Sequence, residues 1–500
     1  MFSPREYFTP RLPPYPGPFP VGTVEIEIPA PWPKAYPEIQ SSVETLLFRL
    51  FYPVSADVFE ACEAQHPFWF PEDRREYLRA LVDFTNRPAI AGNLISRIPY
   101  ITDTVLPCKA NLPLKAAPEG QKWPVVLFSH GLGGTRNTYS QFCGSMASHG
   151  FIVIAPEHRE HSAPLTHVRD FSAKGWVQKR VHYRREMEIN QDARILRTYQ
   201  LVQRSREIVS ILRVLLVQQP ELLPIDRAAV EAGRQIDPIK FDWSQVNTKL
   251  DEVILSGHSF GASTVVSLAK GAYHHVEMLF ETKDSVPISN VLGFERVPSN
   301  LETPIIDRED EFLRPVSTPA LLLLDPWGIP VYHTMSIPLT VPTLANMSQP
   351  FYNWGANMKL IYQLLSNSAV EESAKPVPPI KTHLFLTQPS AHASQSDLTL
   401  LFPTLSRVLF KIPGCSAENQ TAVMDMNVTS CVEFLREQGI SSYDVTAEGA
   451  EGLMKAETSE HPVHEPNDKL TKGYLVADGK IQGWSRLDVK DGISVVNILE

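Results

Sequence analysis

One seven-residue stretch, Ser256-Gly257-His258-Ser259-Phe260-Gly261-Ala262, constrains the fold of this chain more than any other. The short segment Glu252-Val253-Ile254-Leu255 precedes it, and its apolar, mostly β-branched residues are typical of a buried strand. Small and apolar residues at helical spacing follow it as far as Lys270. A strand, Gly-x-Ser-x-Gly and a helix form a nucleophile elbow, whose sharp turn presses the two glycines together. The stretch therefore predicts a strained Ser259 whose hydroxyl stands clear of a sheet.

Strand and helix patterns alternate along the rest of the chain, which predicts an α/β fold with a mostly parallel sheet and helices on both faces. The first two strands are expected to start the sheet antiparallel. The helices are expected at residues 72–84, 138–149, 195–215 and 262–270, with another beginning near Asp397. The strands are expected at residues 24–28, 46–53, 124–129, 151–155, 252–255, 320–324, 338–344 and 382–386.

Composition divides the chain into three parts. Residues 1–22 are rich in proline and predict an extended arm lying on the body. Residues 23–430 are expected to form the catalytic domain, with a polar, weakly periodic insertion at 273–318 before the strand at 320–324. Residues 431–500 are expected to be a C-terminal extension, since the chain becomes acidic and polar beyond about residue 440.

The overall balance of residues excludes several classes of protein. A hydrophobic fraction of 43% and a charged fraction of 20% indicate a globular protein with a large core. The net charge of −10 argues against nucleic acid as a partner. Five cysteines without Cys-x-x-Cys spacing indicate neither a disulfide framework nor a zinc site. No phosphate-binding loop or dinucleotide fingerprint occurs, so neither a cofactor nor a metal is expected.

The start of the chain lacks the basic and then apolar pattern of a signal peptide, and Phe2 excludes N-myristoylation. The sequence has no apolar run of about 18 residues that could span a membrane. These features predict a cytoplasmic protein without a transmembrane helix.

Two stretches have alternative interpretations. The aromatic cluster at residues 67–71 could touch lipid or line an acyl pocket, although core packing is favoured. The charge-rich residues 157–206 include Lys179-Arg180 and could face phospholipid, although a solvated helical face is favoured.

A serine hydroxyl needs a neighbouring base, and the base needs an orienting acid. With a nucleophile elbow, the acid follows the serine along the chain and the histidine comes last. Asp325 directly follows four leucines of an expected strand, which favours it as the acid. Asp307, Glu309 and Asp310 are rivals, but they lie in the expected insertion without a strand before them.

The histidine of such a site should lie in a loop after the last strand. His392 follows the strand near residues 382–387 and precedes the helix expected near Asp397. His383 is the alternative, but it lies within the strand, and His333 follows Asp325 too closely. His258 lies in the elbow itself and is expected to point elsewhere.

Ester hydrolysis also needs two N–H donors for the developing oxyanion. One is expected from Phe260, the residue after the serine, and the second from the loop after the 124–129 strand. That loop reads His130-Gly131-Leu132-Gly133-Gly134, and the N–H of Leu132 is the favoured second donor. The alternative is an ordinary glycine-rich turn.

Several stretches together resemble the platelet-activating factor acetylhydrolases, serine-dependent phospholipases of group VII type. The elbow alone would not bring the other matching blocks into order, so the resemblance is specific, and it covers roughly residues 10 to 410. The matching stretches are Leu12-Pro13-Pro14-Tyr15 with Gly17-Pro18, residues 47–53, Phe128-Ser129-His130-Gly131-Leu132-Gly133, residues 147–153, Glu157-His158-Arg159, Lys240-Phe241-Asp242, Gly257-His258-Ser259-Phe260-Gly261 and Leu324-Asp325-Pro326-Trp327.

The resemblance implies an α/β-hydrolase fold and an enzyme that removes a short or oxidised sn-2 acyl chain from glycerophospholipids without calcium. Its partner would be a phospholipid substrate, at a membrane or lipid-particle surface. Carried over by position, Ser259 is the nucleophile, Asp325 the acid and His392 the base, and the N–H groups of Leu132 and Phe260 form the oxyanion hole. His130, Gly131 and Trp327 are candidates for lining the substrate pocket.

The chain departs from the family pattern in two places. The insertion before Asp325 is longer, and the tail beyond about residue 430 has no counterpart; the chain also lacks the signal sequence of the secreted branch. A general carboxylesterase or triacylglycerol lipase is therefore an alternative, since fold does not fix substrate. A catalytically silent binding protein on the same scaffold is a second. The oligomeric state is not indicated.

Overall fold

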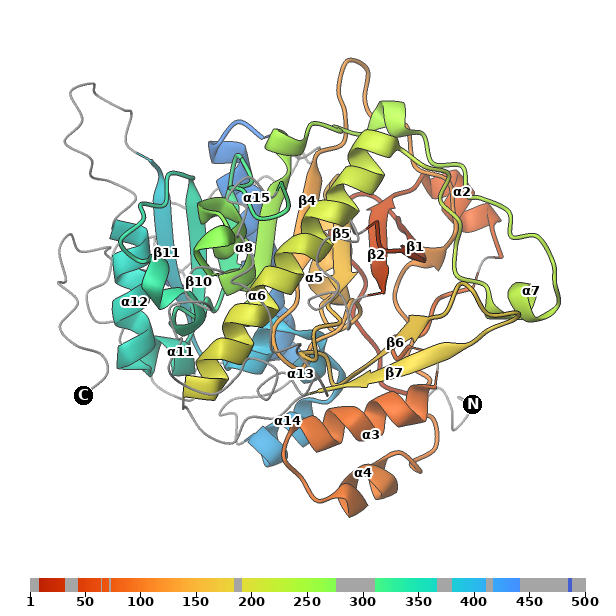
Figure 1. Cartoon of the computed structure of the whole chain (residues 1–500), viewed down its shortest axis with the longest axis horizontal. Helices are drawn as coiled ribbons and strands as arrows, with labels where there is room; N and C mark the ends of the chain where they lie inside the picture. The colour runs from red at the N-terminus through yellow and green to blue at the C-terminus, as the bar shows by residue number, and fades with distance from the viewer. Residues whose placement is uncertain are drawn as a thin grey trace, which may run out of the picture.

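The computed structural model describes residues 9–31, 44–63, 65–71, 73–183, 191–275, 311–366, 380–410, 417–440 and 484–487. A ten-stranded sheet runs through these residues, with helices on both of its faces (Figure 1). The strand order is β12-β11-β10-β9-β8-β4-β5-β2-β1-β3. This arrangement confirms the predicted α/β class and the mostly parallel α/β-hydrolase sheet.

The central strands of the sheet are parallel, and its antiparallel pairs lie toward the margins. The parallel strands are β4 (Val125–Ser129), β5 (Ile152–Glu157), β8 (Ile254–His258), β9 (Leu321–Leu324), β10 (Thr343–Ser348) and β11 (Thr382–Thr387). At one margin β2 (Thr45–Pro53) runs antiparallel to β5 and β1 (Val21–Pro29), which confirms the predicted antiparallel start, and β3 (Lys109–Ala110) lies parallel to β1. At the other, β12 (Trp484–Arg486) runs antiparallel to β11.

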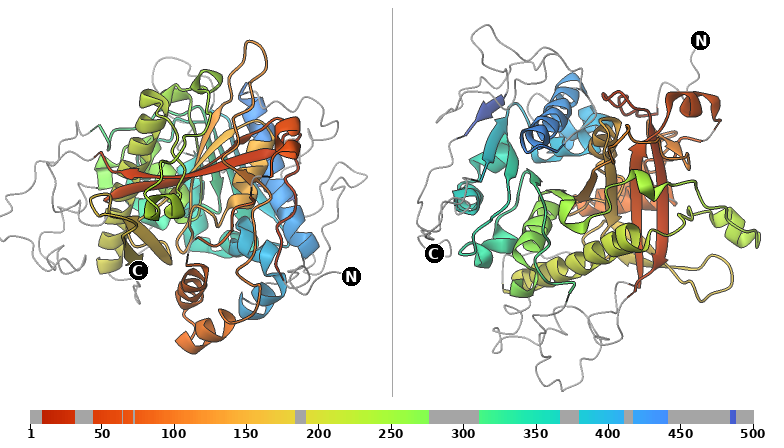
Figure 2. Two further views of the ribbon diagram at one scale, coloured as in Figure 1. Left: turned by 90° about the vertical axis from the view of Figure 1, so that its right-hand side faces the viewer. Right: turned by 90° about the horizontal axis from the view of Figure 1, so that it is seen from above.

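Alternate residues of the central strands feed two separate cores. In β4, Val125 and Leu127 join the core beneath α6 (Gln191–Leu212), α8 (Phe260–Lys270) and α12 (Gly355–Ser366). Val126 and Phe128 join the core beneath α5 (Ser140–Ser148) and α15 (Ala417–Glu437). The right-hand view of Figure 2 shows α6 (yellow-green) and α15 (blue) on opposite sides of the sheet. Because both faces are covered, these strands are continuous apolar runs.

Shorter elements connect this framework. They are the α-helices α2 (Ala56–Ala61), α3 (Arg74–Phe84), α4 (Ala89–Ile95), α7 (Arg227–Glu231), α11 (Gln349–Asn353), α13 (Asp397–Leu401) and α14 (Pro403–Phe410), the hairpin strands β6 (Leu165–Arg169) and β7 (Gln178–His182), the π-helix η2 (Arg213–Gln218), and the 3₁₀-helices η3 (Trp243–Gln245), η4 (Leu250–Glu252), η5 (Ile329–Thr334) and η6 (His392–Gln395). None of the described helices is both long and apolar enough to cross a bilayer.

Several boundaries differ by a few residues from those expected, and two of the differences concern the organisation of the chain. The strand predicted at 338–344 is β10, which begins only at Thr343, because prolines at 338 and 342 carry no N–H for the ladder. Helix α15 continues through residue 430, where the C-terminal extension was expected to begin, and it packs on α5 and η6. Residues 276–310 of the expected insertion and residues 441–483 and 488–500 of the expected extension lie outside the described residues.

The proline-rich arm contacts α5 where the structure describes it. The N–H groups of Gly17 and Phe19 donate to the hydroxyl and carbonyl of Ser148, at 2.9 and 3.1 Å. The ring of Tyr15 lies where a Cβ on Gly144 would stand, so Gly144 lets the arm approach the helix.

The favoured interpretation is confirmed in part for the aromatic cluster at residues 67–71 and is wrong in part for the charge-rich residues 157–206. Trp69 and Phe70 are buried, which confirms core packing for these two, whereas Phe68 is partly exposed. The prediction of a solvated face is wrong for residues 157–160, because Glu157, His158, Arg159 and Glu160 are all buried. Glu157, Arg159 and Glu160 are ion-paired inside the protein with Arg136, Glu27 and Arg204, respectively. Lys179 and Arg180, on β7, are exposed.

Candidate active site

The elbow at Ser259 has the strained geometry that its sequence predicts. Ser259 lies between β8 and α8 with φ 55° and ψ −117°, a conformation that costs a residue with a side chain about 1–3 kcal/mol. A Cβ on Gly257 would lie 2.4 Å from the carbonyl carbon of Gly261. A Cβ on Gly261 would lie 1.9 Å from the carbonyl oxygen of Ser129. Both glycines are therefore required by contact between backbones.

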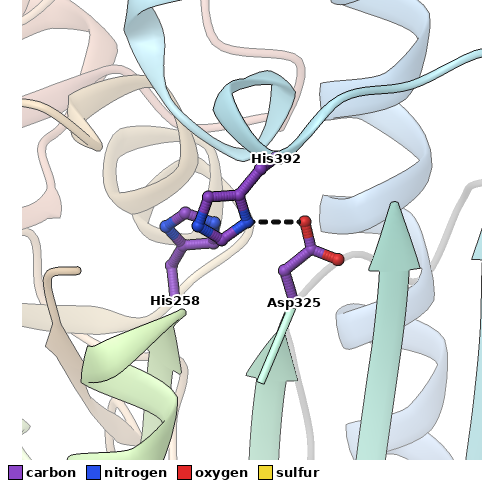
Figure 3. Close-up of side chains that lie close together, drawn as sticks. All are labelled: His258, Asp325 and His392. Carbon is purple, nitrogen blue, oxygen red and sulfur yellow. Dashed lines mark hydrogen bonds and ion pairs between the residues drawn. The ribbon is translucent and has the colours of Figure 1, made fainter. Parts of the chain in front are cut away.

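The strand order gathers the three candidate catalytic residues at one edge of the sheet. Ser259 follows β8, Asp325 follows the neighbouring β9, and His392 opens η6 shortly after β11. The carboxyl ends of parallel strands meet at the same edge, where sites of this architecture form. His392 Nδ1 lies 3.0 Å from Asp325 Oδ2 (Figure 3).

The carboxylate of Asp325 is fully buried and fixed by several donors. The Ser348 N–H donates to Oδ1 and the Ser348 hydroxyl to Oδ2, each at 2.5 Å. The Asp325 N–H donates to the Asn346 carbonyl at 2.8 Å, which ties the residue to β10. With His392 Nδ1 as a further donor, the carboxylate has one orientation.

The imidazole of His392 lies between two rings. The ring of Phe351 stacks on it, with centroids 3.9 Å apart and planes 3° apart. The His258 ring lies 4.3 Å away by centroids (Figure 3). The His392 side chain is 35% exposed, whereas Ser259 is only 7% exposed. The packing leaves His392 one open side.

The expectation that His258 points elsewhere is wrong, since its ring lies against His392. The hydroxyl of Tyr139 holds it there, 2.7 Å from His258 Nδ1. Burial and the neighbouring His392 lower the pKa of His258 well below its ordinary value. His258 is therefore neutral and adds no positive charge beside His392.

The loop at residues 130–134 lies directly against the elbow. A Cβ on Gly131 would stand 3.1 Å from the Cβ of Ser259. The Gly131 N–H donates to the Tyr139 hydroxyl at 3.3 Å, and the Gly133 N–H to the Ser162 carbonyl at 2.8 Å. Among the described residues no acceptor is found for the Leu132 N–H between them. The N–H of Phe260, in the first turn of α8, has no intrahelical acceptor either.

The three candidates for lining a substrate pocket have different surroundings. Gly131 lies beside Ser259. The Trp327 ring lies edge-on to Phe260, and the Trp327 backbone N–H donates to the Ser259 carbonyl at 3.4 Å. His130 is buried, with Nδ1 2.9 Å from the Gly131 carbonyl and Nε2 accepting from the His158 N–H at 3.0 Å. Burial and the charge of Arg204 lower the pKa of His130 to about 3. Its neutral ring braces the loop from inside, so the expectation of a substrate contact is corrected.

Within the described part of the chain, two groups of side chains have spacings that could suit a metal ion. His258, Asp325 and His392 form one group, and Asp73, Glu76 and His167 form the other; within each group the potential ligand atoms lie within 4.8 Å of one another. In the first group the Asp325 oxygens already accept the hydrogen bonds described above. In the second, Glu76 is ion-paired with Arg180 at 2.8 Å.

The rival candidates lie away from the elbow or outside the described residues. His383 is in β11 and bonds Glu437 at 2.7 Å, and His333 packs edge-on to His275. Asp307, Glu309 and Asp310 fall outside the described residues.

Sequence reasoning missed three residues that hold the site. Ser348 ends β10 next to Asp325, so its place at a neighbouring strand end was a usable signal. Tyr139 directly precedes α5 and Phe351 lies in the short helix α11, and no local pattern marks either residue.

Comparisons with known proteins identify the family of this chain. The family model described as "Platelet-activating factor acetylhydrolase, isoform II" matches residues 7–283. A Schizosaccharomyces pombe protein named "Putative phospholipase A2" is 29% identical over 458 residues, covering 86% of this chain and 93% of that protein. The platelet-activating factor acetylhydrolases of Gallus gallus and Canis lupus familiaris are each 31% identical, covering 46% and 44% of this chain. The matches cover 52% and 45% of those two proteins, so the chain spans about half of their length.

Among solved structures, a ferulic acid esterase from Streptomyces cinnamoneus matches 88% of this chain and 98% of its own, with 13% identity and a TM-score of 0.44. The family match includes the loop at 130–134 and the elbow, and it ends before Asp325 and His392. Those two positions therefore depend on the geometry described above. Because the family model covers more than half of its residues, the chain belongs to the platelet-activating factor acetylhydrolase isoform II family.

Proposed function

We propose that this chain is a calcium-independent serine hydrolase that cleaves the short or oxidised sn-2 acyl ester of glycerophospholipids resembling platelet-activating factor. The observation that carries the proposal is the Asp325–His392 pair at the same sheet edge as the strained Ser259. Membership of the family supports a phospholipid ester as the substrate.

In the proposed reaction, the Ser259 hydroxyl attacks the ester carbonyl while His392 Nε2 accepts its proton. Asp325 accepts a hydrogen bond from His392 Nδ1 and stabilises the imidazolium. The N–H groups of Leu132 and Phe260 donate to the oxyanion of the tetrahedral intermediate. His392 then protonates the departing lysophospholipid oxygen, and water, deprotonated by His392, releases the short acid from the acyl-serine.

The surroundings of His392 support its role as the base. The neutral His258 beside it does not repel the imidazolium that forms during attack. The face of the Phe351 ring attracts a cation stacked on it. Both rings therefore favour a histidine that gains and loses a proton in each cycle.

Covalent labelling tests the serine mechanism. A fluorophosphonate probe should label the wild-type protein, and Ser259→Ala should abolish the labelling. Ser366→Ala, at the end of α12, is the matched control and should label normally. A wild-type protein that does not react would contradict the proposal and favour the silent binding protein.

A substrate comparison tests the lipid class. We expect faster turnover of a phospholipid with an sn-2 acetyl group than of a triacylglycerol emulsion, with no change on adding EGTA. Preference for the emulsion would instead support a general lipase. Activity that disappears with EGTA and returns with calcium would contradict calcium independence.

An apolar face on α4 supports contact between this enzyme and a lipid surface. Ile90, Leu94 and Ile98 are 67%, 59% and 51% exposed, and the first two lie four residues apart on the helix. Helix α4 packs on α3, and the two lie together at the lower edge of the molecule (Figure 1). The ring of Phe84, at the end of α3, lies where a Cβ on Gly133 would stand. Helix α3 therefore lies between the exposed face and the loop beside Ser259 and contacts both α4 and the loop.

Vesicle sedimentation tests this lipid contact. The triple variant Ile90→Ser, Leu94→Ser and Ile98→Ser should bind phosphatidylcholine vesicles more weakly, while its hydrolysis of a soluble short ester stays as in the wild type. The control variant Val217→Ser, Leu223→Ser changes two exposed apolar residues elsewhere and should bind normally. Equal binding by both variants would contradict the contact.

A further inference from the structure

Arg204, on α6, is a fully buried arginine whose guanidinium contacts three separate segments. Its Nε donates to Glu160 Oε1 at 2.5 Å, and its Nη2 donates to the Ser162 hydroxyl at 2.6 Å. Its Nη1 donates to the His130 carbonyl at 2.7 Å. The guanidinium carbon also lies 4.5 Å from the centroid of the Phe260 ring. One side chain thus joins the loop after β4, the segment after β5 and the start of α8.

These contacts converge on the two N–H groups proposed for the oxyanion hole. His130 lies two residues before Leu132, and the Ser162 carbonyl accepts the hydrogen bond from the Gly133 N–H. Arg204 therefore supports the chain on both sides of Leu132: it contacts His130 directly and Gly133 through Ser162. The Phe260 ring, against the same guanidinium, belongs to the residue that carries the other N–H.

We infer that Arg204 is a positioning residue that sets the separation of the Leu132 and Phe260 N–H groups. The inference rests on the proposed function, because it assigns a role within the same site. A guanidinium is planar and its donors point in fixed directions. It therefore fixes the positions of its several acceptors relative to one another, which an ammonium group cannot do. Oxyanion donors act only within a narrow range of distances, and small displacements of catalytic groups cost large factors in rate.

The charges around Arg204 are compatible with this role. Burial alone would raise the pKa of Glu160, but the charge and hydrogen bond of Arg204 lower it below its ordinary value. Glu160 is therefore the ionised partner of Arg204. Burial raises the pKa of Glu207 and lowers that of His158, so these two neighbours form an uncharged pair 2.7 Å apart.

A double variant tests the inference without leaving a buried charge alone. Arg204→Met with Glu160→Gln removes both charges and all four hydrogen bonds of the fork, including one from Nη1 to the Thr264 hydroxyl at 3.4 Å. The matched control is Arg159→Met with Glu27→Gln, since Arg159 and Glu27 form another buried pair, 2.9 Å apart, with Arg159 fully buried. Three measurements are compared: thermal unfolding, kcat and KM on a soluble short ester, and the affinity of a trifluoromethyl ketone that forms a tetrahedral adduct with serine.

The Arg204 double variant should lose about 10²–10³-fold in kcat with little change in KM, the loss expected for an oxyanion donor. Its affinity for the ketone should fall in parallel. The control should unfold at a lower temperature than the wild type but keep kcat and ketone affinity. A role in stability alone would lower both unfolding temperatures and leave both kcat values unchanged, which would overturn the inference.

Arg204→Lys is a second test in case the double variant does not fold. It keeps the positive charge beside Glu160 and loses the fork, so kcat and ketone affinity should still fall together. Wild-type values for both would overturn the inference. Failure of the proposed function gives a different result, since the wild-type protein would then either not react with the fluorophosphonate probe or have turnover that Ser259→Ala retains, whatever happens at Arg204.

Discussion

Ser259 and the loop at residues 130–134 are held by backbone contacts and buried charges, whereas Asp325 and His392 are held by side-chain hydrogen bonds and ring stacking. In the first half of the site, formed by Ser259 and this loop, glycines allow backbones to touch, and the Arg204–Glu160 pair braces the loop. In the second half, Ser348 orients Asp325 and Phe351 stacks on His392. We therefore expect a single added carbon atom in the first half to abolish activity, whereas changes in the second half should lower activity by degrees.

The largest expected effect comes from Gly261→Ala, in the first half. The new Cβ would meet the Ser129 carbonyl at 1.9 Å, so β4 and α8 must separate. We expect loss of fluorophosphonate labelling by roughly 10²-fold or more, because the serine and the loop would no longer be aligned. Gly355→Ala is the control, since a Cβ there meets nothing within 4 Å. Normal labelling of Gly261→Ala would show that the elbow tolerates extra atoms and would break the comparison.

A smaller effect is expected from Ser348→Ala, in the second half. This change removes the hydroxyl donor to Asp325 Oδ2 and leaves the backbone donor to Oδ1 in place. A hydrogen bond to a charged group contributes about 1.5–3 kcal/mol, so kcat should fall about 10–100-fold. Ser348→Thr keeps a hydroxyl and should recover part of the rate. An unchanged kcat in steady-state assays would show that the backbone donor alone orients the acid.

The smallest effect on catalysis is expected from Lys270→Met, at the far end of the helix that begins beside Ser259. The Lys270 amine is buried and donates to the Thr334 carbonyl at 2.9 Å. Burial lowers its pKa from 10.5 to about 7. Below about pH 7 both folded and unfolded chains carry the proton, and burying that charge destabilises the fold. Between about pH 7 and 10.5 the folded chain has released the proton and the unfolded chain has not, so stability should rise with pH.

Lys270→Met should therefore raise the unfolding temperature at pH 7. The unfolding temperature of this variant should also rise less between pH 7 and pH 10 than that of the wild type. A shift of one pKa unit corresponds to about 1.4 kcal/mol of stability. Thermal melts across this range provide the measurement, with the exposed Lys249→Met as control. The kcat of Lys270→Met should match the wild type. A large loss of kcat would show that the elbow depends on the whole helix.

The two halves also differ in how far sequence alone predicts them. The elbow could be predicted because contact between backbones admits only glycine at residues 257 and 261. Asp325 and His392 could be placed after strands, since parallel strands end at one edge. The nearness of His258 to His392 could not, because it depends on Tyr139, which is 119 residues distant along the chain.

The buried charges were missed for a related reason. A charged run is usually a solvated surface, and nothing local in residues 157–160 indicates otherwise. The partners of Arg159 and Glu160 lie on β1 and α6, far away in sequence, so only the folded chain reveals that these two residues are paired. Long-range pairing, rather than local propensity, decides which charges can be buried.

The short strand β12 has a consequence for shortened versions of this protein. It covers the outer edge of β11, and Trp484 stacks on Phe385 with ring centroids 4.6 Å apart. A chain cut before Trp484 would expose the unpaired N–H and C=O groups of β11, a template on which strands of other molecules can add. Aggregation during purification would then be the first symptom of the cut, even with every catalytic group retained.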